Sequence, residues 1–139
     1  MKTDEMQILI GEGLGPIRFG NTRDDVRDCF GEPDEMEHTK DDELGKVESW
    51  HYDDMEISLS FFEEDGWELG IISVSAPEYK LKDTKMIGLT MDEAVKTANK
   101  LKLGKPVKDE ENGLVNVFDS ELILWFEEGH LAEIQWGPI

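Results

Sequence analysis

The 139-residue chain has one cysteine and no long apolar run. A single cysteine, Cys29, cannot form an intrachain disulfide, so the sequence gives no sign of an oxidising compartment. Its place on an apolar helix stripe predicts a buried structural thiol. The opening segment, MKTDEMQILI, contains two acids and a short apolar run, which is typical of neither a signal peptide nor a membrane span. We therefore expect a cytoplasmic protein.

Basic residues are also scarce. The chain has 14 Lys and Arg against 33 Asp and Glu, which gives a formal net charge of −19 at pH 7. Phosphate binding needs clustered Lys and Arg, so the charge argues against nucleic acid and anionic membranes as partners. Fifteen of the acids, with only two lysines among them, lie between Glu32 and Glu68. This concentration suits either plain solubility or docking onto a basic protein.

The residue patterns of common active sites and metal sites are missing. His38, His51 and His130 have no His or Cys partner at a metal-ligand spacing. Ser58, His51 and Asp53 could form a catalytic triad on paper, but no nucleophile elbow accompanies them. The acids Glu63–Asp65 lack the spacing of a calcium loop. We therefore predict no catalytic residues, no metal site, no cofactor and no enzyme activity.

One pattern occurs twice, at Gly20–Pro33 (GNTRDDVRDCFGEP) and at Gly88–Pro106 (GLTMDEAVKTANKLKLGKP). Each copy has a threonine at a helix N-cap position and an acid three residues later, which is the spacing of a capping box. An amphipathic run follows, and Gly31 or Gly104 is expected to end each helix. The apolar stripes of the two helices are Val26, Cys29, Phe30 and Met91, Ala94, Ala98, Leu101.

Strand patterns follow both helices. The segments 47–52, 55–62 and 67–74 are predicted strands after the first helix, and 114–118, 121–127 and 130–136 after the second. Met6–Ile10 is a candidate edge strand, Glu32–Lys46 a charged loop, and Glu78–Lys85 a charged connector. The sequence thus predicts a single α+β domain made of two repeats, about 6–77 and 78–138. Each repeat is a helix plus a three-stranded antiparallel unit, with the helices on one face of an antiparallel sheet.

Alternation along the strands predicts which residues face the helices. In the first repeat, Tyr52 is expected to pair with Met55 across a turn at Asp53-Asp54. The core face is then Trp50, Tyr52, Met55, Ile57, Leu59 and Phe61, and the opposite face is Ser49, His51, Glu56, Ser58, Ser60 and Phe62. In the second repeat the predicted core face is Ile123, Trp125, Ala132, Ile134 and Trp136. The predicted open face there is Leu122, Leu124, Phe126, Leu131, Glu133 and Gln135. That open face is unusually apolar, which is typical of either a binding surface or a covered one.

The doubled capped helix followed by antiparallel strands resembles the beta-lactamase-inhibitor-like fold, which is related to a small lipoprotein of the bacterial outer-membrane assembly machinery. The segment GLGPIRFGNTRDDVRDCFGEP is also similar to the opening of a group of small uncharacterised bacterial proteins that begin Gly-Pro-Ile-x-Phe-Gly. The chain differs from the secreted inhibitor in having no signal segment and no cysteine pair. The resemblance implies a sheet face that grips another protein without catalysis.

The sequence therefore favours a non-catalytic, acidic protein-binding module, most simply an immunity or inhibitor protein that neutralises a basic toxin or enzyme. Two alternatives stay open: a self-associating assembly module, including a homodimer, and a protein that binds a small ligand or a cation. The predicted partner-binding residues lie on the acidic segment and on the two open faces. They are Asp41, Asp42, Glu43, His51, Glu56, Ser58, Phe62, Leu124 and Leu131.

Overall fold

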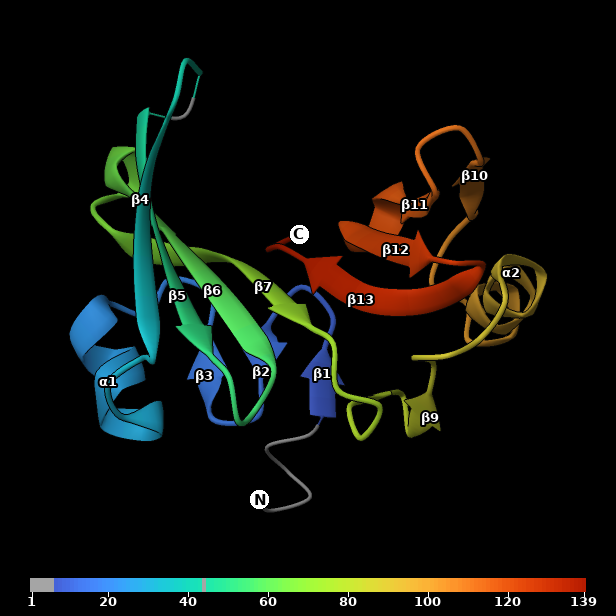
Figure 1. Ribbon diagram of the computed structural model, residues 1–139, viewed down its shortest axis with the longest axis horizontal. Helices are drawn as coiled ribbons and strands as arrows, with labels where there is room; N and C mark the ends of the chain where they lie inside the picture. Colours follow the sequence, from blue (N-terminus) through green and yellow to red (C-terminus); the bar gives the residue numbers. More distant parts are fainter. Residues whose placement is uncertain (1–6, 44) are drawn as a thin grey trace.

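Strands dominate the computed structural model, which describes residues 7–43 and 45–139 (Figure 1). Within these residues the α-helices are α1 (Arg23–Phe30) and α2 (Met91–Lys100). The strands before α2 are β1 (Gln7–Leu9), β2 (Gly13–Leu14), β3 (Ile17–Arg18), β4 (Glu35–Asp41), β5 (Gly45–Tyr52), β6 (Ile57–Phe62), β7 (Glu68–Val74), β8 (Lys80–Leu81) and β9 (Thr84–Lys85). Those after α2 are β10 (Val107–Asp109), β11 (Leu114–Val117), β12 (Leu122–Glu127) and β13 (His130–Trp136). Single 3-10 turns occupy Glu63–Asp65 and Phe118–Ser120.

The strands form two sheets. The eight-stranded sheet has the order β10-β11-β12-β13-β7-β6-β5-β4, and all its neighbouring strands are antiparallel. The five-stranded sheet has the order β3-β2-β1-β8-β9, in which β1 is parallel to β8. Each α-helix leads into four strands of the larger sheet, and these two sets of strands meet where β7 pairs with β13.

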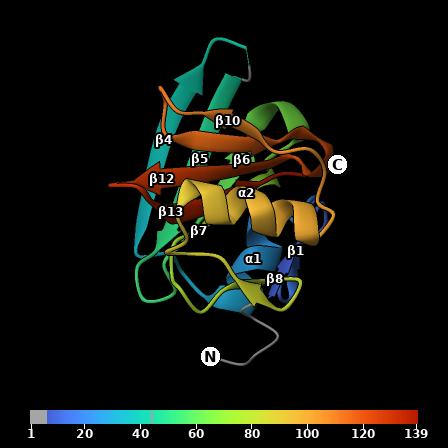
Figure 2. The ribbon, with the colours of Figure 1, turned by 90° about the vertical axis from the view of Figure 1, so that its right-hand side faces the viewer.

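The predicted fold class is wrong. The chain is mostly strand, each α-helix precedes four strands of the large sheet, and a second sheet packs beside the middle of the first (Figure 1; Figure 2). The indole Nε1–H of Trp136 on β13 donates to the carbonyl oxygen of Gly13 on β2 at 3.2 Å. The small sheet therefore covers core residues that the prediction gave to the helices. The division into repeats at about 6–77 and 78–138 stays a prediction.

The segments predicted as charged loops contain three of the strands that the sequence did not predict, β4, β8 and β9. Glu32–Lys46 includes the seven-residue strand β4, and Glu78–Lys85 includes β8 and β9. The strands β8 and β9 could not be predicted from the sequence because they have two residues each, although Tyr79, Leu81 and Met86 are buried in and beside them. The predicted edge strand Met6–Ile10 is β1 from Gln7 onward, but it lies in the middle of its sheet. Met6 lies outside the described residues.

The predicted core face of the first half is confirmed. Tyr52 pairs with Ile57 across the β5–β6 turn, two residues beyond the predicted partner Met55. A shift of two residues leaves every side chain on its predicted face, because strand side chains alternate with period two. The buried members are Trp50, Tyr52, Ile57, Leu59 and Phe61.

The predicted faces of β12 are wrong, whereas Ile134 and Trp136 of β13 are buried as predicted. The register places Leu122 opposite Trp136 and Leu124 opposite Ile134, so these four side chains share one face and all are buried. The prediction had split them between the two faces. A one-residue error in register exchanges the faces of a strand. A bulge between Trp125 and Phe126 then returns Leu131 to the core side.

Both predicted capping boxes are present. The hydroxyl of Thr22 accepts from the Asp25 N–H, and the hydroxyl of Thr90 accepts from the Glu93 N–H. Gly31 ends α1 with a φ of 80°, whereas α2 ends at Lys100, before the predicted stop at Gly104. The α2 stripe is confirmed by the burial of Ala94 and Ala98. The prediction that Cys29 is a buried thiol is wrong, because this residue is exposed on α1. Val26, one helical turn earlier, is the buried residue of this helix.

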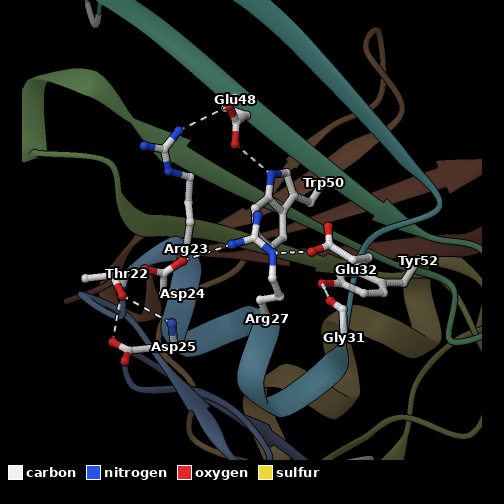
Figure 3. A network of polar contacts seen from close by, with 10 residues as sticks. All are labelled: Thr22, Arg23, Asp24, Asp25, Arg27, Gly31, Glu32, Glu48, Trp50 and Tyr52. Carbon is white, nitrogen blue, oxygen red and sulfur yellow. Dashed lines mark hydrogen bonds and ion pairs between the residues drawn. The ribbon is translucent and has the colours of Figure 1, made fainter.

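A buried carboxylate fixes α1 to the large sheet (Figure 3). Glu48 on β5 is 7% exposed and accepts a hydrogen bond from Trp50 Nε1 at 2.7 Å. Its other oxygen lies 3.2 Å from Arg23 Nη1 on α1 and 2.8 Å from His38 Nε2 on β4. Burial raises the pKa of Glu48, but the hydrogen bonds from Trp50 and His38 and the charge of Arg23 outweigh burial and hold the pKa below 4.5. The ion pair thus joins α1, β4 and β5.

Three further contacts hold α1 in place. The guanidinium of Arg23 lies 4.8 Å from the ring centre of Trp67, and that of Arg27 lies 5.0 Å from the ring centre of Trp50. Such cation–π contacts need close approach of the helix to the sheet. The hydroxyl of Tyr52 donates to the Gly31 carbonyl oxygen at 2.7 Å, and burial raises its pKa to about 12.

The close approach of β2 to β3 makes Gly13 intolerant of a side chain. A Cβ at this position would lie 2.0 Å from the carbonyl oxygen of Ile17. We expect Gly13→Ala to lower the free energy of unfolding by about 2–3 kcal/mol, because backbone must move. Urea unfolding would show a lower midpoint with an unchanged slope. The exposed neighbour is the control: Glu12→Ala should stay within about 0.5 kcal/mol. Equal midpoints for both variants would contradict the close β2–β3 approach.

Candidate functional site

The face of the large sheet turned away from the core is a continuous surface. One row of side chains crosses all eight strands, and each member pairs with the next. None of the row is buried, whereas the residues that flank its central members along the strands are core residues. We call this the open face. Its row runs through Glu35, His51, Ser58, Ser73, Gln135, Ile123, Asn116 and Val107.

A cavity of about 390 Å³ lies on the half of the open face formed by β4, β5, β6, β7 and β13. We call it the acidic cavity, because five carboxylates line it and its lining includes no Lys or Arg. Serine hydroxyls and one histidine complete its polar wall. The carboxylates are Glu35, Glu37, Asp53, Glu56 and Glu133, and the other polar side chains are His51, Ser58, Ser73, Ser75 and Tyr52.

His51 links two walls of the acidic cavity. Its Nδ1 lies 2.7 Å from Ser58 Oγ, across the β5–β6 pair. Its Nε2 lies 2.9 Å from Glu37 Oε1 on β4, close enough for an ion pair but without the alignment of a hydrogen bond. The residues come together because Ser58 on β6 pairs with His51 on β5, and Glu37 on β4 lies diagonal to His51. The sequence had grouped Ser58 and His51 with Asp53, and the structure puts Glu37 against the imidazole instead.

The arrangement of Ser58, His51 and Glu37 lacks a feature that acyl transfer requires. An oxyanion hole needs hydrogen-bond donors directed at the developing charge. Ser58 lies within β6, which is paired on both sides, so the backbone N–H groups around it belong to the sheet. The surrounding carboxylates would also repel a developing anion. The geometry suits recognition of a hydrogen-bond donor or a cation better than nucleophilic attack.

Glu133 on β13 adds to the cavity's preference for a cation. The side chain is half-buried, and burial raises its pKa above the ordinary value because the charged form is poorly solvated. A cationic group bound beside it would offset this penalty. No metal site is evident: across residues 7–43 and 45–139, no three His, Cys, Asp or Glu side chains are grouped to hold an ion.

A second, less polar cavity of about 260 Å³ lies on the other half of the open face. Its lining includes Ile71, Ile123 and Phe118, and the Phe118 side chain is 65% exposed. Gln135 of the central row borders this cavity, while Ser73, its partner on β7, borders the acidic one. The open face is therefore acidic towards β4 and more apolar towards β12.

The structure divides the nine predicted partner-binding residues into three groups. His51, Glu56 and Ser58 line the acidic cavity. Asp41, Asp42 and Glu43 are exposed at the tip of the β4–β5 hairpin, which projects from the rest of the molecule (Figure 1). By register the tip is six residues from the Glu35–His51 pair, or about 20 Å. Asp41 Oδ1 accepts there from the Glu43 N–H at 2.8 Å.

The third group was placed wrongly. Leu124 is fully buried and Leu131 is 1% exposed, so neither can contact a partner. Phe62 is 8% exposed, and one edge of its ring lies against Gly70, where a Cβ would come within 2.7 Å of Phe62 Cδ2. The predicted partner-binding residues did not include Glu35, Glu37, Ser73 or Glu133, although alternation had placed Glu133 on the open face. These residues reach one cavity through the pairing of β4 with β5 and of β7 with β13, which cannot be read from local sequence.

Neither a protein-family model, nor a curated protein, nor a solved structure was found to match this chain. The resemblance to the beta-lactamase-inhibitor-like fold therefore stays a prediction. The absence of enzyme activity also stays a prediction. Along the described chain, the helices are too short or too polar to cross a membrane.

Proposed function

We propose that the protein is a non-catalytic binding module that holds a basic protein partner on the acidic half of its open face. In its concrete form it is a cytoplasmic immunity or inhibitor protein that neutralises a basic toxin or enzyme. One observation carries the proposal: the acidic cavity, with five carboxylates and no Lys or Arg in its lining, on a sheet face whose central row of side chains is not buried.

The chemistry of the cavity favours a lysine or arginine side chain of the partner. Carboxylates such as Glu37 and Glu133 accept from a guanidinium or an ammonium, and the hydroxyl of Ser73 can accept as well. The net charge of −19 would also attract a basic protein over longer range and speed its association. The apolar half of the open face offers the contact area that charged groups alone do not supply.

The alternative of a self-associating module was based on an apolar open face that included Leu124 and Leu131. Both residues belong to the core, so they do not support self-association. A small cationic ligand would use the same carboxylates as a basic side chain. The size of the species that the protein captures, a protein or a small molecule, distinguishes these two alternatives.

A charge-reversal pair tests the proposal. The wild-type protein, immobilised, is used to capture a partner from a lysate of the native organism at low and high salt. We expect the double variant Glu37→Lys, Glu133→Lys to bind the purified partner at least about tenfold more weakly, because two cavity carboxylates become repulsive. Calorimetry or surface plasmon resonance would measure the dissociation constants.

The control carries the same charge change away from the cavity. Glu110 and Glu111 are exposed between β10 and β11, and Glu110→Lys, Glu111→Lys should retain binding within about twofold at moderate salt. Equal weakening by both double variants would mean that only net charge matters. No partner at any salt, or a cavity variant that binds like wild type, would refute the proposal.

A further inference from the structure

The outer strand β4 leaves a long edge of the large sheet without a neighbouring strand in the part of the chain that the structure describes. All seven of its residues are exposed, and its register with β5 runs from Glu35–His51 to Asp41–Gly45 without a bulge. An edge of this kind presents a row of backbone N–H and C=O groups to solvent. The opposite edge, β10, has only the three residues Val107–Asp109. The large sheet therefore has one edge long enough to accept another strand.

The side chains of β4 differ between its two faces. Glu37 reaches His51 on the open face, and His38 reaches Glu48 on the α1 side. By alternation, Glu35 and Asp41 lie on the same side as Glu37, and Met36 and Lys40 lie with His38. The open-face side of the edge is therefore acidic, and it is continuous with the acidic cavity, which Glu35 and Glu37 line.

The edge could pair with a second copy of β4 or with a basic strand of another protein, and charge decides between these two. In an antiparallel pair of two β4 copies centred on His38, Glu35 would face Asp41 of the other copy, and Glu37 would lie diagonal to Glu37 and Asp41 of the other copy. Like charges directly opposite each other destabilise strand pairing. A strand with Lys or Arg at alternate positions would instead place cations beside Glu35, Glu37 and Asp41. The edge thus disfavours a second copy and favours a basic strand.

We propose that β4 is the docking edge for an extended basic segment of the partner, which adds a ninth strand to the large sheet. Backbone hydrogen bonds along β4 supply the register, and alternate Lys or Arg side chains lie over the acidic cavity. This inference rests on the proposed function and specifies how the partner engages the open face.

The test uses a defined probe, the peptide acetyl-(Thr-Arg)4-amide, with the full-length protein. We expect it to slow hydrogen exchange of the backbone amides in residues 35–41 by about tenfold or more at saturation. A peptide of the same sequence with every backbone nitrogen methylated keeps the charge but cannot donate backbone hydrogen bonds. It should bind at least about tenfold more weakly. Equal affinity for the two peptides, binding without protection of 35–41, or no binding would overturn the inference.

The two proposals fail in different ways. A captured partner that depends on Glu37 and Glu133 but leaves exchange in 35–41 unchanged would remove strand addition and keep the proposed function. A captured partner that protects 35–41 but tolerates Glu37→Lys, Glu133→Lys would contradict the cavity as the binding site. A matched acidic peptide, acetyl-(Thr-Glu)4-amide, should not bind, and comparable affinity for it would overturn the charge argument.

Discussion

Leu124→Glu is expected to leave the protein largely unfolded. The Leu124 side chain is 0% exposed, between Val115 on β11 and Ile134 on β13. A carboxylate there would be buried without a partner and would also remove a core side chain. Together these effects cost about 4–5 kcal/mol or more, comparable to the whole stability of many small proteins. Circular dichroism and urea unfolding would show the loss.

The matched control is the preceding residue of the same strand. Ile123 lies in the central row of the open face and is only half-buried. We expect Ile123→Glu to fold and to lose no more than about 1 kcal/mol. The reverse result, with Ile123→Glu unfolded and Leu124→Glu folded, would restore the faces predicted from the sequence and would contradict the observed register.

The comparison of these two positions explains how far the sequence could predict the fold. In the first half, the Asp53-Asp54 turn marks the hairpin well enough that a two-residue shift left Trp50, Leu59 and Phe61 on the correct face. In the second half, both faces of β12 carry large apolar residues, so alternation alone could not choose between them. The choice comes from pairing Leu122 with Trp136, and from Trp136 packing on Gly13, more than a hundred residues away.

The first residues of the two helices were predictable for the opposite reason. A capping box needs only two residues three apart, so Thr22 with Asp25 and Thr90 with Glu93 could be read directly. The sheet edge could not, because β4 has no apolar alternation: its residues EMEHTKD are all exposed and are held by pairing with β5. A strand stabilised only by its neighbour looks like a loop in the sequence.

The candidate site falls between these cases. His51, Glu56 and Ser58 were predicted as partner-binding residues because they belong to one predicted open face, and they do line one cavity. Their partners Glu37 and Glu133 come from β4 and β13, whose positions depend on long-range pairing. Local alternation can therefore predict the residues that the central hairpin contributes to the site. Predicting the residues that the other strands contribute requires the full strand order.

Glu48→Ala is expected to destabilise the protein by about 2–3 kcal/mol. The change leaves Arg23 and His38 without their shared carboxylate and Trp50 Nε1 without its acceptor, in a place that is 7% exposed. Glu48→Gln keeps an acceptor for Trp50 but removes the charge, so we expect a smaller loss of about 1 kcal/mol. Urea unfolding at neutral pH would measure both, and two variants as stable as wild type would contradict the anchoring role.

The advantage of wild type over Glu48→Gln should depend on pH, with a sign fixed by the direction of the shift. The folded protein holds the pKa of Glu48 below 4.5, the value expected for the unfolded chain. The charged carboxylate therefore contributes its full stabilisation above that value, and the contribution is lost as the pH falls through the lower, folded pKa. Glutamine does not titrate, so the difference between the two unfolding free energies isolates Glu48 from the other carboxylates. We expect that difference to shrink as the pH falls from about 5 to about 3. A difference that stays constant to low pH would mean that Arg23 and His38 do not stabilise the charged form.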